Sequence, residues 1–310
     1  MKSDFSGLIV PVLTPVDEQG RLDEKHYVKL LHRLMARGVD GLFVTGTTGE
    51  AAQLADPTWE AANRVALREA AGSRTKVYCG AVFPGTADTI AHIHRLQDMG
   101  AEYAFATPTF YNTDGTQEQV LRHYERIVAA TQIKLIVYSI AFTTHVDIRP
   151  QTLYEISQMD RMIGVKDTRA DWPSHLENLK LLKDTKMGIA CVIEAMIASS
   201  LLSGADGIVT ALANFMPEYY VDVLKAAREN DVQGVYRAFE GIMNLERAMR
   251  CPGGNGVAKM KYLGSLLDVC EPYTSMSTAH VTEEQKQTIQ GTCRYILSEM
   301  ERLGVPAEWR

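Results

Sequence analysis

The chain has 310 residues, of which 46% are hydrophobic and 23% charged, with a formal net charge of −6 and a pI near 5.8. This length and composition are typical of a globular protein with one large domain or two ordinary ones. The acidic balance argues against nucleic acids and anionic membranes as partners, because both recruit basic surfaces.

Targeting and redox signals are weak. No run of about 18 apolar residues occurs, and the first residues, MKSDFSG, lack the apolar core of a signal peptide. The five cysteines are scattered and form no Cys-x-x-Cys pair, which favours reduced thiols in a cytoplasmic protein. His92 and His94 stand close together but belong to no convincing ligand set, so no metal is expected.

Short apolar runs alternate with helix-length segments along the first two thirds of the chain. The runs cover residues 7–14, 41–46, 76–82, 103–108, 134–140, 162–168, 187–193 and 207–212. Near-continuous apolar runs are typical of parallel strands covered on both faces. The first long segment between two of them, 23–38, has apolar residues at helical spacing and a glycine at its end.

Eight such units predict an α/β protein, a (β/α)8 TIM barrel. An open, doubly wound sheet is the alternative, but the first strand is not followed by a Gly-x-Gly-x-x-Gly loop. Beyond residue 216 the strand signals stop. Helices are expected over 217–248, with a break near Asn230, and then over 256–268 and 283–303. We therefore expect a catalytic barrel at 1–216, followed at 217–310 by the last barrel helix and a C-terminal helical extension.

Reactive side chains gather at the predicted strand ends, where a barrel of this type places its active site. Thr47 and Thr48 follow the second strand, Tyr111 follows the fourth, and Tyr138 and Lys166 lie in the fifth and sixth. The glycines of the GTTGE turn (46–50) permit a tight turn whose amides and hydroxyls suit a carboxylate. Its last residue, a glutamate near a helix start, is interpreted as structural.

Lys166 is the residue that most needs an explanation, because it interrupts an apolar strand. If Ile163 and Val165 face the helices, alternation points Lys166 into the barrel, and Gly164 leaves room beside it. Burial disfavours the charged amine, so a neutral, nucleophilic, Schiff-base lysine is one interpretation. The other is an ammonium that reaches solvent or pairs with Asp167. The strand alone does not decide between them.

Tyr138 favours the catalytic interpretation. It is expected at a similar height on the neighbouring strand, flanked on its face by Ile136 and Ile140. A phenol beside a Schiff-base site can move protons between the amine, the carbinolamine and the substrate oxygen. The alternative is a packed tyrosine with one hydrogen bond.

With these residues in place, the sequence resembles the family of dihydrodipicolinate synthase and N-acetylneuraminate lyase. These are class I Schiff-base aldolases on a (β/α)8 barrel with a helical extension. The anchors are GTTGE, TPTFYN (107–112), the strand that holds Tyr138, and GVKDT (164–168). The resemblance implies that Lys166 forms the Schiff base, Tyr138 relays protons with Thr47, and Thr48 binds the carboxylate of a 2-oxo acid. It also implies a homotetramer, a relay role for Tyr111 across a subunit interface, and no cofactor.

The pocket rim departs from the family. The synthases carry an arginine five residues beyond the catalytic tyrosine, where this chain has Thr143, and the sialic-acid lyases carry an Asp-Glu pair where it has Glu194 and Ala195. Losing a bidentate guanidinium weakens the case for a synthase. The resemblance to the sialic-acid lyases also implies that Thr168 contacts the distal part of the substrate, and Val209 is expected to contact the substrate.

The expected function is therefore an aldolase or dehydratase that acts on a 2-oxo acid, namely a 4-hydroxy-2-oxo acid or a 2-keto-3-deoxy sugar acid. Pyruvate is the expected product or substrate, with an aldehyde as the other partner. The alternatives are a 4-hydroxy-tetrahydrodipicolinate synthase, an N-acetylneuraminate lyase and, in a different class, a non-catalytic protein that binds 2-oxo acids.

Overall fold

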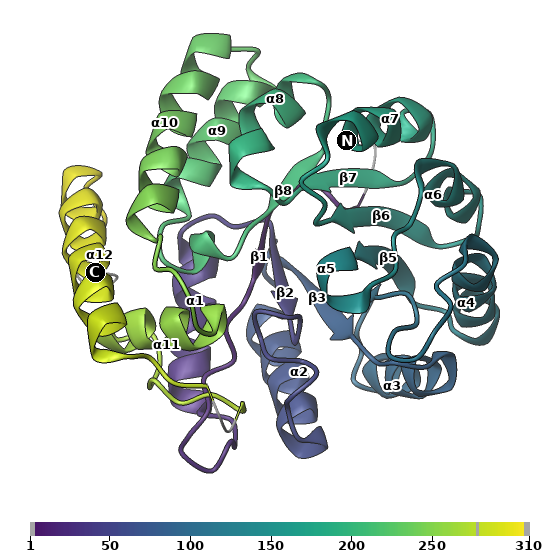
Figure 1. Cartoon of the computed structure of the whole chain (residues 1–310), viewed down its shortest axis with the longest axis horizontal. Helices are drawn as coiled ribbons and strands as arrows, with labels where there is room; N and C mark the ends of the chain where they lie inside the picture. Colours follow the sequence, from purple (N-terminus) through teal and green to yellow (C-terminus); the bar gives the residue numbers. More distant parts are fainter. Residues whose placement is uncertain (1–3, 277–278, 307–310) are drawn as a thin grey trace.

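The computed structural model describes residues 4–276 and 279–306, so the first three residues of the MKSDFSG stretch lie outside it. Within these ranges eight parallel strands form a closed barrel in sequence order, as predicted (Figure 1). They are β1 (Gly7–Pro11), β2 (Gly41–Val44), β3 (Lys76–Ala81), β4 (Tyr103–Ala106), β5 (Lys134–Ser139), β6 (Met162–Asp167), β7 (Gly188–Cys191) and β8 (Gly207–Val209). Each lies inside the apolar run that predicted it.

Helices surround the barrel, and none in the described ranges is long and apolar enough to cross a membrane. The α-helices are α1 (Glu24–Ala36), α2 (Asp56–Ala70), α3 (Thr86–Asp98), α4 (Gln117–Ala130), α5 (Ala141–Thr144), α6 (Pro150–Ser157), α7 (Trp172–Leu182), α8 (Ile197–Leu202), α9 (Glu218–Arg228), α10 (Val232–Ala248), α11 (Gly256–Leu266) and α12 (Glu283–Arg302). Short 3₁₀ turns follow β7 and β8, namely η1 (Glu194–Met196) and η2 (Leu212–Asn214).

Local sequence sets the helix ends. The Asp23 carboxylate accepts the His26 amide at the start of α1, and capping boxes open α4 and α12. The predicted break near Asn230 is confirmed. This residue has a φ of +57° and separates α9 from α10, because a left-handed residue cannot continue a right-handed helix.

Alternation along the strands separates two cores. Leu8 and Val10 of β1 point outward and pack with the helices, whereas Ile9 points inward. The inner core is a stack of large side chains that fills the barrel, as in other (β/α)8 folds. A side chain that faces inward near the C-terminal end of a strand therefore packs directly on the apolar side chains of this inner core.

The expectation for Ile163 is wrong. Between Leu135 and Ile136 the pairing of β5 with β6 shifts, so that Leu135 lies opposite Met162 and Ile136 opposite Gly164. Ile163 falls in this irregularity and packs against the inner core instead of facing the helices. Val165 does face outward, so alternation resumes before Lys166.

The lower end of the barrel is closed by the segment before β1. Phe5 is fully buried inside the barrel, and its ring meets Tyr78 edge-on with centroids 5.7 Å apart. A Cβ atom at Gly164 would lie 2.3 Å from the Phe5 ring, so the room expected beside Lys166 is occupied. We call this segment before β1 the Phe5 plug. The Asp4 carboxylate holds it in place by accepting a hydrogen bond from Lys134 Nζ at 2.5 Å.

The C-terminal helices gather on one side of the barrel (Figure 1). Helix α10 packs on α8 and α9, and α12 lies along α10 and α11. The division into a barrel at 1–216 and an extension at 217–310 stays a prediction.

Candidate active site

Lys166 lies inside the barrel near the C-terminal end of β6, and only 4% of its surface is exposed. Its Nζ stands 3.9 Å from the centre of the Tyr138 ring and 5.0 Å from that of Phe43. Within residues 4–276 and 279–306 no carboxylate lies in ion-pair range of this amine. The Asp167 carboxylate is on the outer face and accepts Arg169 Nε at 3.0 Å, so it does not pair with Lys166.

Burial decides the protonation of this amine. Desolvation lowers the pKa of Lys166 from 10.5 to about 7, because the charged form loses its hydration inside the barrel. The aromatic faces attract an ammonium, but by less than full desolvation costs. Near neutral pH a large fraction of Lys166 is therefore uncharged, which is the nucleophilic form of an amine.

Tyr138 is the direct neighbour of Lys166 across the β5–β6 pair. It is buried between Ile136 and Ile140 in the inner core, as alternation predicts. Its hydroxyl and that of Thr47 share a hydrogen bond of 2.9 Å. Burial raises the pKa of Tyr138 above its usual range, so this residue is a neutral phenol that can accept one proton while it passes another to Thr47.

The GTTGE turn carries Thr47 from the end of β2 to the mouth of the barrel. A Cβ atom at Gly46 would lie 2.6 Å from the Phe43 ring, so only glycine lets the turn rest on that ring. The amide of Glu50 donates to Thr47 O at 3.1 Å. No hydrogen bond among the described residues uses the amides of Thr47 and Thr48, which leaves both available to a carboxylate.

Of the floor of the site, only Val209 was singled out from the sequence. The rings of Phe43 and Phe105 lie 3.8 Å apart, and both meet Tyr138 edge-on. Val209 and Ala190 complete the buried wall on the far side. Alternation within GLFVTG and YAFATP was the available signal, since it places each phenylalanine on the inner face.

The predicted rim residues are spread around the mouth. Thr143 is exposed on α5, the short helix after β5. The Thr168 hydroxyl donates to Ser139 O at 2.9 Å. Glu194 on η1 accepts the Thr210 hydroxyl at 2.7 Å, and burial raises the pKa of its carboxyl. These two polar groups are thus already engaged within the chain.

Tyr111 is not brought to the site within this chain. Its side chain is 87% exposed, and its backbone is left-handed with a φ of +58°. Asn112 has the same unusual conformation, with a φ of +52°. The loop therefore holds the phenol away from its own core, and its relay role stays a prediction.

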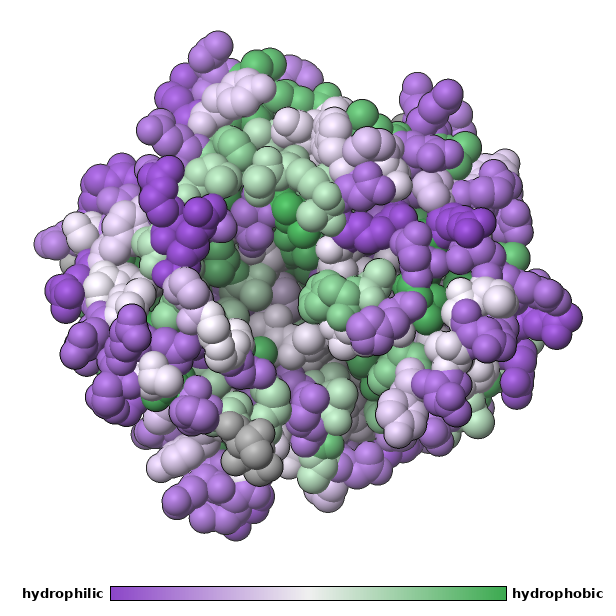
Figure 2. All heavy atoms as spheres, in the orientation of Figure 1, coloured by the Kyte–Doolittle hydropathy of each residue, from purple (hydrophilic) through white to green (hydrophobic). Residues whose placement is uncertain are grey.

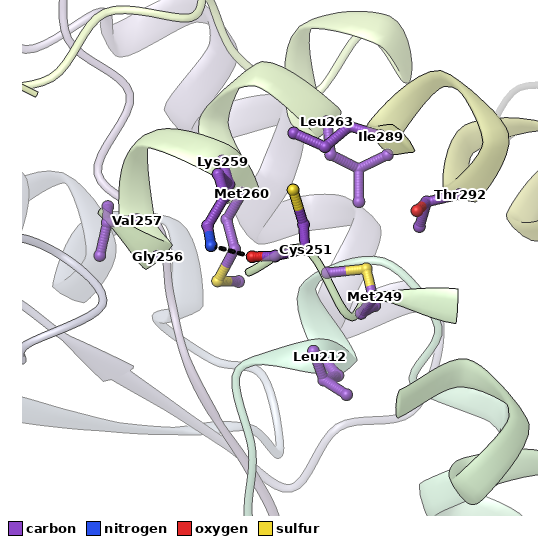
Figure 3. Close-up of a pocket in the computed structure, with 10 residues that line it drawn as sticks. All are labelled: Leu212, Met249, Cys251, Gly256, Val257, Lys259, Met260, Leu263, Ile289 and Thr292. Atoms are coloured by element: carbon purple, nitrogen blue, oxygen red, sulfur yellow. Dashed lines mark hydrogen bonds between the residues drawn. The ribbon is translucent and has the colours of Figure 1, made fainter. Parts of the chain in front are cut away.

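The mouth is visible as a hollow over the middle of the barrel, beside α5 (Figure 2). A separate cavity of about 310 Å³ lies where η2, α11 and α12 meet. Its walls are mainly apolar, with Leu212, Met249 and Met260 among them (Figure 3). Within the described ranges no three histidine, cysteine or carboxylate side chains gather as a metal site requires.

A buried lysine with a lowered pKa beside a tyrosine, at the mouth of a (β/α)8 barrel, is typical of a Schiff-base-forming lyase of the class I aldolase type. The model of the dihydrodipicolinate synthetase family matches residues 4–294. The chain belongs to this family.

Its relatives agree with this assignment. A 4-hydroxy-tetrahydrodipicolinate synthase of Xanthomonas campestris is 31% identical over 72% of this chain and 73% of its own length. One from Neisseria meningitidis serogroup B is 24% identical over 94% of this chain and 98% of its own. The solved dihydrodipicolinate synthase of Bacteroides thetaiotaomicron matches with a TM-score of 0.88 at 27% identity, covering 95% of this chain and 100% of that one.

Proposed function

We propose that this lyase breaks or forms the C3–C4 bond of a 4-hydroxy-2-oxo acid or a 2-keto-3-deoxy sugar acid, with pyruvate as product or substrate. The observation that carries the proposal is the state of Lys166, a buried amine with a pKa lowered to about 7 that rests on the ring of Tyr138. Such an amine attacks a ketone carbon at neutral pH, which a fully charged lysine does not do.

In the first half of the reaction, the uncharged Nζ of Lys166 adds to C2 of the 2-oxo acid to give a carbinolamine. Loss of water then yields an iminium. The Tyr138 hydroxyl, 2.9 Å from Thr47, moves the protons that these steps require. The free amides of Thr47 and Thr48 hold the substrate carboxylate at the mouth side of the amine.

In the second half, the iminium accepts the electron pair of the C3–C4 bond, which leaves an enamine on Lys166. The C4 hydroxyl becomes the aldehyde and gives its proton to Tyr138, which passes its own to Thr47, while Thr47 gives its hydroxyl proton to water at the mouth. The reverse transfer through the same two hydroxyls brings a proton back for C3. Protonation of the enamine at C3 and hydrolysis of the iminium release pyruvate. If a hydroxyl leaves instead of the aldehyde, the same groups carry out a dehydration.

The test is borohydride trapping with pyruvate, read by intact mass and peptide mapping, with Lys166→Ala as the control. We expect a reduced adduct on Lys166 that is absent from the variant. An adduct with a longer 2-oxo acid but none with pyruvate would point to a dehydratase with a larger pocket. No adduct with any 2-oxo acid, from folded protein, would leave a barrel that binds without catalysis and would refute the proposal.

The second candidate is a 4-hydroxy-tetrahydrodipicolinate synthase, and the names of the curated relatives favour it. The residues at the rim of the pocket argue against a synthase. Thr143 stands where the synthases carry an arginine, and Arg169 already pairs with Asp167 and Asp147. A comparison of aldehydes with and without a carboxylate separates the two candidates. A strong preference for the carboxylate would favour the synthase, and indifference would favour the aldolase.

A sialic-acid lyase is supported less well. Only Glu194 remains of the acidic pair, and it is hydrogen-bonded to Thr210 within the chain. Assembly and location are also proposals: a cytoplasmic homotetramer in which Tyr111 enters a neighbouring subunit. Its 87% exposure is the observation in favour. Light scattering at assay concentration tests this, since a monomer would remove the relay across the interface.

A further inference from the structure

A second buried lysine lies outside the steps described above. Lys261, in the middle of α11, is fully buried and pairs with Glu50, which is also fully buried. Lys261 Nζ and Glu50 Oε1 are 2.5 Å apart. Taking both charges out of water costs several kcal/mol per ion, so such a pair adds little to stability over an apolar one, and fixing one arrangement is a known use.

Glu50 is the last residue of the GTTGE turn, and its side chain contacts two parts of the C-terminal region. One carboxylate oxygen meets Lys261, and the other accepts the Ser275 amide at 2.5 Å. The backbone of Glu50 is left-handed, with a φ of +62°, a conformation that a non-glycine residue adopts only when its surroundings impose it. The two contacts supply that constraint.

The same residue is joined to the proposed proton relay. The Glu50 amide donates to Thr47 O, and the Thr47 hydroxyl is hydrogen-bonded to Tyr138. A continuous set of contacts therefore runs from α11 through the turn to the phenol beside Lys166. A displacement of Glu50 moves the backbone that carries Thr47.

Packing alone fixes α11 only in part. Val257, Met260 and Leu263 of the same helix line the cavity of about 310 Å³ (Figure 3). Unfilled space deprives these side chains of the dispersion contacts that hold a close-packed helix in place. The charge pair joins α11 directly to the turn.

We propose that Glu50 and Lys261 are positioning residues that hold Thr47 and Thr48 in the geometry needed for proton transfer and carboxylate binding. The C-terminal extension thereby becomes part of the active site without touching the substrate. This inference rests on the proposed function, because it assumes the roles of Thr47 and Tyr138 described there.

The test compares three variants of the full-length chain. Glu50→Gln breaks the pair and leaves Lys261 buried without its carboxylate partner. Glu50→Gln/Lys261→Met removes both charges. Glu218→Gln is the matched control, because it breaks the pair of Glu218 with the largely buried Arg37, which joins α9 to the end of α1 and not to the GTTGE turn. The measurements are Tm, borohydride trapping of pyruvate, and the rate at which pyruvate methyl protons exchange for deuterium.

We expect Glu50→Gln to be less stable than the unchanged chain. At a temperature well below the Tm of this variant, it should exchange the pyruvate methyl protons at least tenfold more slowly than the unchanged chain does. The double variant should regain most of the Tm while its exchange stays slow. Glu218→Gln should lose stability but exchange at the normal rate. If exchange recovers together with Tm in the double variant, the pair only stabilises the fold and the proposal is wrong.

A second measurement tests whether the effect of Thr47 on exchange depends on the Glu50–Lys261 pair. Thr47→Val should slow exchange about tenfold in the unchanged chain but less than twofold in the double variant, where Thr47 is already displaced. A full tenfold cost in both backgrounds would overturn the proposal. The double variant carries no unpaired charge, so it decides the question even if Glu50→Gln does not fold. Failure of the unchanged chain to trap any 2-oxo acid would refute the proposed function, whereas normal trapping and exchange in all variants would refute only the positioning.

Discussion

Lys166 and Lys261 are both buried, with 4% and 0% of their surfaces exposed, yet their surroundings are opposite. Lys261 faces the Glu50 carboxylate at 2.5 Å. Lys166 faces the rings of Tyr138 and Phe43, and burial lowers its pKa to about 7. Burial by itself therefore does not make a lysine reactive. What distinguishes Lys166, the proposed nucleophile, is the lack of a counter-charge within the described residues.

Removing the reactive amine should have the largest effect. Lys166→Met should slow the exchange of pyruvate methyl protons by about 10⁴-fold or more, because no other group forms the Schiff base. Proton NMR in deuterium oxide measures this rate. An exchange rate near that of the unchanged chain would mean that the wrong lysine was chosen.

Lys166→Met also tests how much the burial of Lys166 costs in stability. Below pH 7 Lys166 is charged in both the folded and the unfolded chain, so the folded state bears the full burial cost. That cost fades as the pH rises from about 7 towards the unfolded pKa of 10.5. Lys166→Met should therefore be more stable than the unchanged chain at pH 6, by on the order of 4 kcal/mol. The gain should shrink towards zero near pH 10, which urea unfolding at both pH values would check.

Giving Lys166 a partner should make it resemble Lys261. Ala190 lies opposite Lys166 on β7 and faces the barrel interior. The carboxylate of Ala190→Asp should favour the ammonium and reduce the rate of pyruvate trapping at pH 7 by about 10²–10³-fold. The rate should recover at higher pH. Ala190→Asn has the same size without the charge, so an equal loss in both variants would mean that crowding, not charge, is responsible.

Tyr138→Phe should slow methyl exchange by about 10²-fold, because the ring still supports Lys166 but the relay loses its hydroxyl. The borohydride adduct should still form when the reaction is left long enough. If the adduct is lost together with exchange, Tyr138 serves to shape the pocket for the amine instead of moving protons.

The smallest effect is expected from Thr47→Val, about tenfold on exchange, since it removes one hydrogen bond to Tyr138 and leaves the phenol in place. Thr47→Ser keeps the hydroxyl and should retain most of the activity. Equal losses in the two variants would argue against a role for this hydrogen bond.

The barrel could be predicted because each strand is a short apolar run followed by a helix-length segment, and both signals are local. The break at Asn230 was equally local. Ile163 was placed wrongly because the register shift that turns it inward depends on the neighbouring strand. Gly164 was expected to leave room, but Phe5 fills it from a part of the chain about 160 residues away.

For the site, strand alternation brought Lys166 and Tyr138 together, and the GTTGE turn indicated Thr47 and Thr48. The resemblance gave these two threonines their separate roles. The pairing of Glu50 with Lys261 could not be predicted from the sequence. The interpretation of Glu50 as a structural residue assumed a helix start at this point, but the structure has a turn there and α2 begins only at Asp56. Lys261 lies 211 positions further along the chain. No periodicity or motif joins two such positions, and only the packing of α11 over the turn does so.

The Phe5 plug has a consequence for the order of events. Because the lower end of the barrel is sealed, substrates and products share one passage. The half of the substrate bound to Lys166 lies deepest, and the aldehyde half lies nearer the opening. The aldehyde must therefore depart first, and water follows it inward to free the remaining half. In the proposed reaction, a different aldehyde can enter by the same passage before that water arrives and be joined to the waiting enamine.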